Sequence, residues 1–120
     1  MAWAVKVTDK YAAWFTALIK QDLDSATQVA QAVAALREEG PTLGRPLVDR
    51  LKATKIHHLK ELRPRSKGRS EIRIIFAFDP PGQRCYSWAA TRAGNWACWY
   101  RDNIPLAERL YIDYTADEEE

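Results

Sequence analysis

The 120-residue chain predicts an α+β domain, in which a small, mostly antiparallel sheet carries an N-terminal helical hairpin on one face and a C-terminal helix. Two observations support this prediction. Apolar residues recur at helical spacing between residues 10 and 39, and they alternate at strand spacing between residues 71 and 79. Because helices and strands occupy separate parts of the chain, we expect the helices to cover a sheet of consecutive strands. The length suits a single domain over residues 1–120.

The N-terminal end predicts a strand followed by a helix. Residues 2–7 alternate as a strand does. Thr8 or Asp9 can cap a helix over residues 10–21, because a short side-chain oxygen accepts hydrogen bonds from free backbone N–H groups. The apolar stripe of this helix is formed by Tyr11, Trp14, Phe15, Leu18 and Ile19.

A second helix is expected from Asp22 or Asp24 to about Glu39. Its apolar stripe is formed by Val29, Val33 and Leu36. Gly40 and Pro41 end it, since glycine suits the position after a helix and proline cannot continue one. The link between the two helices is very short, which predicts a helical hairpin lying on the sheet.

The middle of the chain predicts a loop followed by three strands. Residues 41–56 show no clear periodicity and are expected to form a loop with a helical turn near residues 47–51. Strands are expected over residues 57–63, 71–79 and 83–91, and a Pro-Pro-Gly turn joins the last two as an antiparallel hairpin.

The strand over residues 71–79 has one wholly apolar face. Four large side chains share that face: Ile72, Ile74, Phe76 and Phe78. Successive side chains of a strand point to opposite faces. Arg73 therefore belongs to the other face, and we expect it on the open side of the sheet, away from the core.

The C-terminal part predicts helical structure after a turn at residues 92–94. Asn95 can cap a helix that contains Trp96, and Pro105 suits the first turn of a final helix. The acidic tail over residues 116–120 is expected to be flexible.

The net charge of +2 conceals a basic segment. Residues 41–75 hold ten of the eighteen Lys and Arg residues but three of the sixteen Asp and Glu residues. Clustered positive charge attracts phosphate-bearing partners, and arginine forks match phosphate oxygens. Two plainer interpretations stay open: the cations form a solvated surface, or Arg73 makes an ion pair with Glu61 or Glu71.

Several classes of function find no support in the sequence. No apolar run approaches the roughly 18 residues of a membrane span, and the N-terminus lacks the apolar centre of a signal peptide, so we expect a cytoplasmic protein without a membrane partner. His57 and His58 are neighbours on an expected strand and point to opposite faces, so neither a metal site nor a cofactor is predicted. Cys85 and Cys98 are expected to be free thiols.

Four blocks of the chain resemble a known family: Leu59-Lys60-Glu61-Leu62-Arg63-Pro64, Ile72-Arg73-Ile74, Gly94-Asn95-Trp96 with Trp99-Tyr100, and Ile104-Pro105. Together they are similar to the HigB-type branch of the RelE toxin superfamily, and the similarity covers nearly the whole chain. The resemblance implies a RelE-like fold and the toxin of a type II toxin–antitoxin module. It also implies a protein antitoxin, often with a helix-turn-helix domain. The toxin would then associate with DNA only indirectly, through this antitoxin.

The resemblance further implies a metal-independent endoribonuclease that cleaves mRNA on the ribosome, by attack of a 2′-hydroxyl on the adjacent phosphate. The implied catalytic residues are Arg63, Arg73, Arg92 and Tyr100. The implied RNA-binding residues are Lys60, Arg65, Lys67, Arg69 and Trp96. For Trp96 and Tyr100, packing in the core stays an alternative to contact with RNA. Where the family often has Gly-Asp-Lys, this chain has Ala90-Thr91-Arg92, so a carboxylate is lost and attenuated activity is expected.

The residues leave the general base open. His57 or His58 is a candidate because imidazole titrates near neutral pH, and a lysine or arginine in a crowded cationic site, helped by Tyr100, is another. A second hypothesis of a different class is a non-catalytic module that binds RNA or a protein partner with the same basic face. An RNA-cleavage assay with and without ribosomes separates the two hypotheses.

Overall fold

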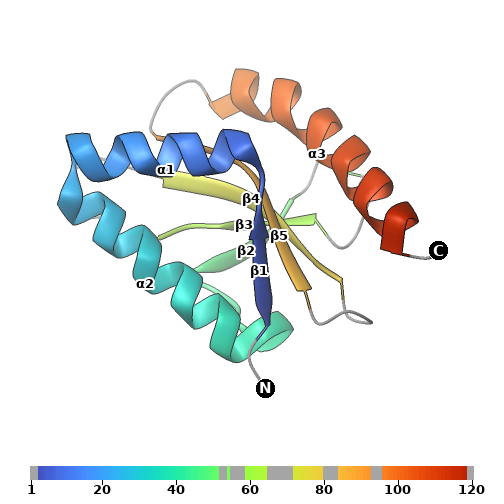
Figure 1. Cartoon of the computed structure of the whole chain (residues 1–120), viewed down its shortest axis with the longest axis horizontal. Coiled ribbons are helices and arrows are strands. Elements are labelled where there is room, and N and C mark those ends of the chain that lie inside the picture. Colours follow the sequence, from blue (N-terminus) through green and yellow to red (C-terminus); the bar gives the residue numbers. More distant parts are fainter. Residues whose placement is uncertain are drawn as a thin grey trace.

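The computed structural model describes residues 3–51, 54, 59–64, 72–79, 84–92 and 96–118. A five-stranded sheet lies between two helical layers, with helices α1 and α2 on one face and α3 on the other (Figure 1). The elements in chain order are β1 (Ala4–Val7), α1 (Asp9–Gln21), α2 (Leu23–Glu39), a 3₁₀ turn (Gly40–Thr42), β2 (Val48–Arg50), β3 (Leu59–Leu62), β4 (Ile72–Asp79), β5 (Arg84–Arg92) and α3 (Trp96–Glu118). The predicted α+β class is confirmed.

The strands are arranged in the order β1-β5-β4-β3-β2. β2, β3, β4 and β5 pair antiparallel in sequence, whereas β1 pairs parallel with β5 at the other edge. The prediction of a helical turn over residues 47–51 was wrong, because Val48–Arg50 is an edge strand paired with β3. Three residues are too few to show strand alternation, so hydrogen bonds to β3 decide this local structure.

The helical hairpin forms as its caps predict. The Thr8 side chain accepts a hydrogen bond from the backbone N–H of Tyr11 at 3.1 Å and caps α1. Asp22 ends α1 and caps α2, where its Oδ1 accepts from the N–H of Ser25 at 3.1 Å. Gly40 ends α2 with a φ of +59°, and a Cβ there would clash with the Trp3 indole, so glycine is required.

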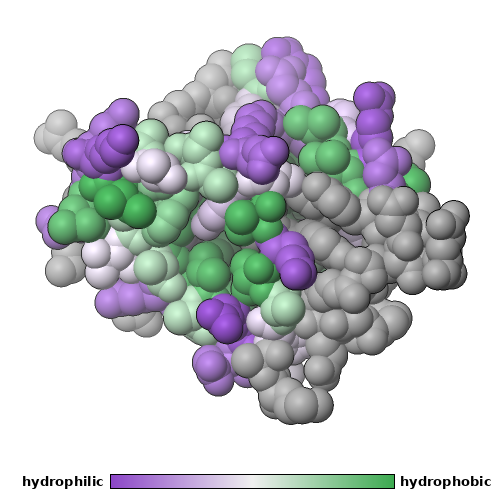
Figure 2. All heavy atoms as spheres, in the orientation of Figure 1, coloured by the Kyte–Doolittle hydropathy of each residue, from purple (hydrophilic) through white to green (hydrophobic). Residues whose placement is uncertain are grey.

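The hairpin face of the sheet holds the larger of two apolar clusters. Its fully buried members include Val29 and Leu36 from α2 and Ile74 and Phe76 from β4. Apolar side chains also lie among charged ones on the outside of the molecule (Figure 2), and Leu23 is 65% exposed where α2 begins. None of the helices in the described ranges is both long and apolar enough to cross a membrane.

The opposite face is covered by α3, a single helix of 23 residues. The expectation that a turn would extend through Arg92 and that Pro105 would begin a separate helix was wrong. Arg92 ends β5, and Pro105 lies inside α3. Proline cannot donate the hydrogen bond expected at its position, but burial of Ile104 and Ala107 against the sheet offsets that loss. Residues 116–118 of the acidic tail are also helical, and 119–120 lie outside the described residues.

Candidate functional site

A cavity of about 310 Å³ is lined by residues from β2, β3, β4 and α3 and the segments that follow β2 and β3. Its lining residues are Asp49, Arg50, Leu51, Glu61, Arg63, Arg73, Tyr100 and Ile104. The volume falls at the lower end of the roughly 300–1,000 Å³ typical of small-ligand sites. Charged groups converge here beside an apolar wall, which is the usual composition of a binding or active site.

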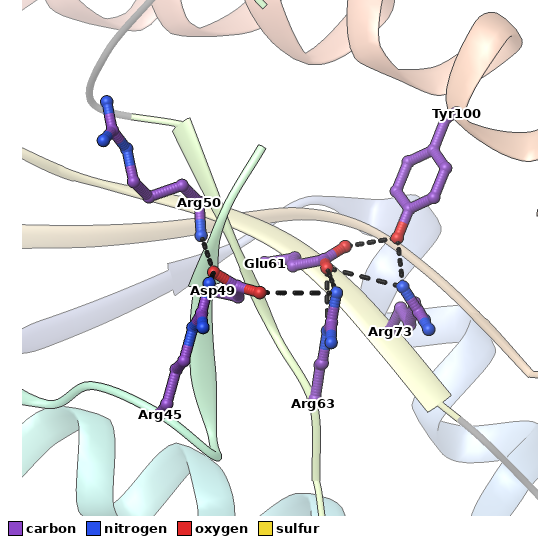
Figure 3. Close-up of polar contacts among 7 residues, drawn as sticks. All are labelled: Arg45, Asp49, Arg50, Glu61, Arg63, Arg73 and Tyr100. Carbon is purple, nitrogen blue, oxygen red and sulfur yellow. Dashed lines mark hydrogen bonds and ion pairs between the residues drawn. The ribbon is translucent and has the colours of Figure 1, made fainter. Parts of the chain in front are cut away.

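Strand alternation explains how the sheet contributes to the cavity. On β3, Leu59 belongs to the α3-side cluster and Leu62 to the hairpin-side cluster. Glu61 has the parity of Leu59 and therefore faces α3. On β4, Arg73 has the opposite parity to Ile72 and Ile74 and faces the same way. Tyr100, in the second turn of α3, reaches these two side chains from the other layer (Figure 3).

Glu61 is the centre of a hydrogen-bonded cluster (Figure 3). Its Oε1 accepts hydrogen bonds from Nε of Arg63 at 2.8 Å and from Nη2 of Arg63, and it lies 3.4 Å from Nη1 of Arg73. Its Oε2 accepts from the hydroxyl of Tyr100. The Tyr100 oxygen in turn accepts from Nη1 of Arg73 at 2.7 Å, which closes a ring of three side chains. A buried carboxylate needs such partners to offset its loss of hydration.

Asp49 extends this cluster toward solvent. Its Oδ2 lies 3.6 Å from Nη2 of Arg63, and its Oδ1 accepts from the backbone N–H of Arg50 at 2.8 Å and from Nη2 of Arg45 at 3.2 Å. The backbone hydrogen bond from Arg50 is the main cause of a lowered Asp49 pKa, and Arg45 and Arg63 contribute further. Asp49 is therefore a stable anion that holds Arg63 at the rim.

Two pKa shifts define the protonation states around Glu61. Burial is the main cause of the raised pKa of Tyr100, the hydrogen bond to Glu61 raises it further, and Arg73 opposes the shift. Burial alone would lower the pKa of Arg63, but its hydrogen bond and charge interaction with Glu61, together with Asp49, raise it overall. Near neutral pH the site thus presents a neutral phenol beside a charged arginine.

Exposure decreases from the rim of the cavity to its floor. The Arg63 side chain is 40% exposed, that of Arg73 is 19% exposed, and that of Glu61 is 3% exposed. A ligand entering the cavity can therefore contact both arginines, whereas Glu61, which also lines the cavity, offers very little exposed surface.

The structure brings three of the predicted catalytic residues together: Arg63, Arg73 and Tyr100. The face expected for Arg73 is correct, but that face is not open, because α3 covers it. The ion pair with Glu61, which had stayed open as an alternative, is present. The other glutamate considered there, Glu71, lies outside the described residues.

The remaining predicted residues have other positions. Lys60 pairs with Phe76 on β4 and has the opposite parity to Glu61, so it belongs to the hairpin face. In the backbone register Arg92 pairs with Ile72, whereas Thr91 pairs with Arg73. Trp96 begins α3; for it and for Arg92 the structure describes the backbone alone. The predicted RNA-binding residues Arg65, Lys67 and Arg69 lie outside the described residues.

Two site residues were missed as functional groups. Glu61 had a signal, because it shares a strand parity with the buried Leu59 and is followed at the next position of that parity by Arg63. Asp49 had none, since β2 was not predicted. In the described part of the chain, no three His, Cys, Asp or Glu residues are grouped so that they could hold a metal ion; His57 and His58 lie outside it.

Comparison with known proteins gives one family and two named relatives. A family model described as phage-derived protein Gp49-like (DUF891) matches residues 14–112. The chain is 39% identical over 120 residues to the "Putative toxin HigB2" of Mycobacterium tuberculosis, an alignment that covers all of this chain and 58% of that protein. It is 43% identical over 105 residues to the "Putative toxin HigB3" of the same organism, covering 88% of this chain and 87% of that protein. No solved structure matches the chain.

Proposed function

The chain belongs to the family of phage-derived Gp49-like proteins and is HigB-like, and from this membership we propose that it is the toxin of a type II toxin–antitoxin module. We further propose that it is a metal-independent endoribonuclease that cleaves mRNA on the ribosome. The family match over residues 14–112 includes every residue that lines the cavity. Because the chain spans 58% of the first relative and 87% of the second, the activity is proposed for the domain as it stands here.

The observation that carries the proposal is the convergence of Arg63, Arg73 and Tyr100 on one cavity. In metal-independent RNA cleavage, a 2′-hydroxyl attacks the adjacent phosphorus, and negative charge grows on the non-bridging phosphate oxygens. Preorganised cations stabilise such a transition state most when they are held rigidly. Arg73 meets this condition, since β4 fixes its backbone and Tyr100 and Glu61 fix its guanidinium.

The shape of the site favours single-stranded RNA. The cavity of about 310 Å³ is suited to one unstacked nucleotide and is too small for a paired helix. Single strands offer bases that can be splayed out and contacted individually, unlike the deep grooves of duplex RNA. This agrees with mRNA as the substrate class.

The proposed partners follow from the same function. They are mRNA, the ribosome and a cognate protein antitoxin, which we expect to carry a helix-turn-helix domain and to provide the contact with DNA. The expected location is the cytoplasm, where translation takes place. No cofactor is part of the proposal.

Expression without an antitoxin tests the proposed function. Induction in bacteria should arrest growth and deplete mRNA. In vitro, the purified protein should cleave mRNA on programmed ribosomes in the presence of a chelator, and it should leave 2′,3′-cyclic phosphate and 5′-hydroxyl ends. Arg73→Ala should abolish both effects, whereas Arg37→Ala, which removes the same charge from the exposed side of α2, should retain them.

Two outcomes would contradict this function. Normal growth and intact messages despite soluble expression would exclude a toxic nuclease. RNA binding without cleavage, with equal losses of binding in arginine variants of the cavity, would favour the non-catalytic binding module instead.

A further inference from the structure

The two oxygens of Glu61 have different partners, and this division suggests a chemical role. Oε1 faces the two arginines, whereas Oε2 accepts from the hydroxyl of Tyr100 (Figure 3). Both residues line the cavity, but the Glu61 side chain is only 3% exposed, whereas Tyr100 is half-buried. The Tyr100 hydroxyl, hydrogen-bonded to Oε2, therefore offers a path for a proton from the more open part of the cavity to a buried carboxylate.

We propose that Glu61 accepts, through the hydroxyl of Tyr100, the proton that the attacking 2′-hydroxyl of RNA loses. This inference rests on the proposed ribonuclease function and supplies the proton acceptor that the sequence left open. Tyr100 is the catalytic residue, because it contacts the substrate. Glu61 is a positioning residue that acts through Tyr100.

The proposed steps conserve every proton. The 2′-hydroxyl gives its proton to the Tyr100 oxygen while Tyr100 passes its own proton to Oε2 of Glu61. The bond between the 2′-oxygen and phosphorus forms, and the bond between phosphorus and the 5′-oxygen breaks. The departing 5′-oxygen takes a proton from water, and the hydroxide that remains is neutralised when Glu61 returns its proton to solvent after product release.

The protonation states support this direction of transfer. The raised Tyr100 pKa, caused first by burial, keeps the phenol protonated, so it has a proton to pass on. Arginine stays charged in proteins and cannot accept one. Asp49, the other carboxylate of the cavity, hydrogen-bonds with Arg45 and the backbone of Arg50 and not with Tyr100.

Charge balance gives the transfer a second consequence. Before attack, the carboxylates of Glu61 and Asp49 and the substrate phosphate together offset the charges of Arg45, Arg63 and Arg73. When the proton reaches Glu61, that carboxylate becomes neutral at the moment when the phosphorane gains a second negative charge. Arg63 and Arg73 can then both stabilise the negative charge of the phosphorane. The net charge of the partly buried site does not change during the step, which matters because charge separation is costly there.

Three variants test the proposal on mRNA-programmed ribosomes. Glu61→Gln keeps the size and an acceptor oxygen but cannot take a proton, so kcat should fall by about 10²-fold or more while KM changes little. Tyr100→Phe removes the connecting hydroxyl and should lower kcat by a similar factor. The double variant should be no slower than either single variant, because both changes interrupt the same path. Asp102→Asn, an exposed carboxylate on α3, is the matched control.

A purely structural role for Glu61 predicts a different pattern. If Glu61 only held the arginines, its replacement would raise KM and its effect would multiply with that of Tyr100→Phe. Either result would overturn the proposal. A wild-type rate for Tyr100→Phe would overturn it too, and this variant decides the matter should Glu61→Gln fail to fold. If the wild-type protein cleaves no RNA at all, the proposed function itself fails, which is a separate outcome.

Discussion

The two faces of the sheet differ in what they bury, since one holds an apolar core and the other holds, in part, the polar cavity. On the hairpin face, Phe76 and Leu62 are wholly buried among apolar side chains. On the α3 face, Ile75 and Ala77 belong to an apolar cluster, whereas Arg73 and its polar partners lie near the N-terminal end of β4. One strand therefore belongs to a dry core on one side and partly to a polar cavity on the other.

This difference shows why the two faces tolerate change differently. Apolar burial is non-directional and depends on volume, so any disturbance of the hairpin face lowers the stability of the whole domain. The polar cluster depends on the direction and charge of a few groups, and a buried carboxylate held by cations adds little net stability as a unit, whereas loss of one partner leaves the other unpaired. On the α3 face we therefore expect changes that leave Glu61 a cationic partner to be visible mainly in the proposed cleavage of RNA.

The largest expected effect belongs to the hairpin face. Phe76→Ala removes a fully buried ring and should lower the free energy of unfolding by about 3–5 kcal/mol. Denaturant unfolding measures this loss, and the cleavage rate for each folded molecule should stay near that of the wild type. A loss of kcat in the folded fraction would show that the two faces are coupled.

Arg73→Ala should give the next largest effect, on the other side of the same sheet. Loss of a rigid cation should lower the cleavage rate at saturating substrate by about 10²-fold or more. RNA affinity should fall much less, and Arg37→Ala should change neither. Single-turnover cleavage and binding measurements distinguish the two quantities, and equal losses in both would contradict a role in the transition state.

Arg63→Ala sharpens the contrast within the cavity itself. Its side chain is 40% exposed at the rim, so it should contribute mainly to substrate binding. We expect KM to rise about tenfold, because one charged hydrogen bond to the substrate is lost, and we expect a smaller change in kcat. A kcat loss as large as that of Arg73→Ala would show that both arginines contribute equally to stabilising the transition state. Lys67→Ala, in the basic segment of residues 41–75, should likewise weaken binding and flatten its salt dependence.

The smallest effect is a titration. The pKa of Tyr100 is raised above its ordinary value of 10.0, so its neutral form stabilises the fold below about pH 10 and this contribution is lost as pH rises through the higher, folded-state value. Phenolate absorbance should show one late titration that is missing in Tyr100→Phe. In Glu61→Gln this titration should move down but not fully to 10.0, because burial, the larger cause, remains. An unchanged titration would contradict the hydrogen bond to Glu61.

Local patterns predicted the hairpin face well. Thr8, Asp22 and Gly40 fix the helix ends through contacts with residues a few positions away, so they can be identified without the rest of the fold. The alternation from Ile72 to Phe78 likewise identified the buried face of β4. These features depend on neighbours in the chain, which is the information that a sequence displays directly.

The site needed long-range information. Glu61 and Tyr100 meet only because α3 covers the sheet, and Asp49 joins them only because β2 pairs with β3. The family resemblance supplied Arg63, Arg73 and Tyr100, and Glu61 was considered as an ion-pair partner of Arg73. Its simultaneous contact with all three side chains became apparent only from the three-dimensional arrangement. Pro105 was misjudged for the same reason, since tertiary packing of α3 outweighs its local preference.

The parallel pairing of β1 with β5 has a consequence for how the protein is made. Val7 lies beside Ser87, so the first strand cannot find its place until nearly the whole domain has been translated. At about 5–20 residues per second, the ribosome needs roughly 4–18 seconds to proceed from β1 to the end of β5. Tyr100 follows later still. Because Tyr100 lines the cavity, a nascent chain cannot complete that cavity until most of this domain has been translated.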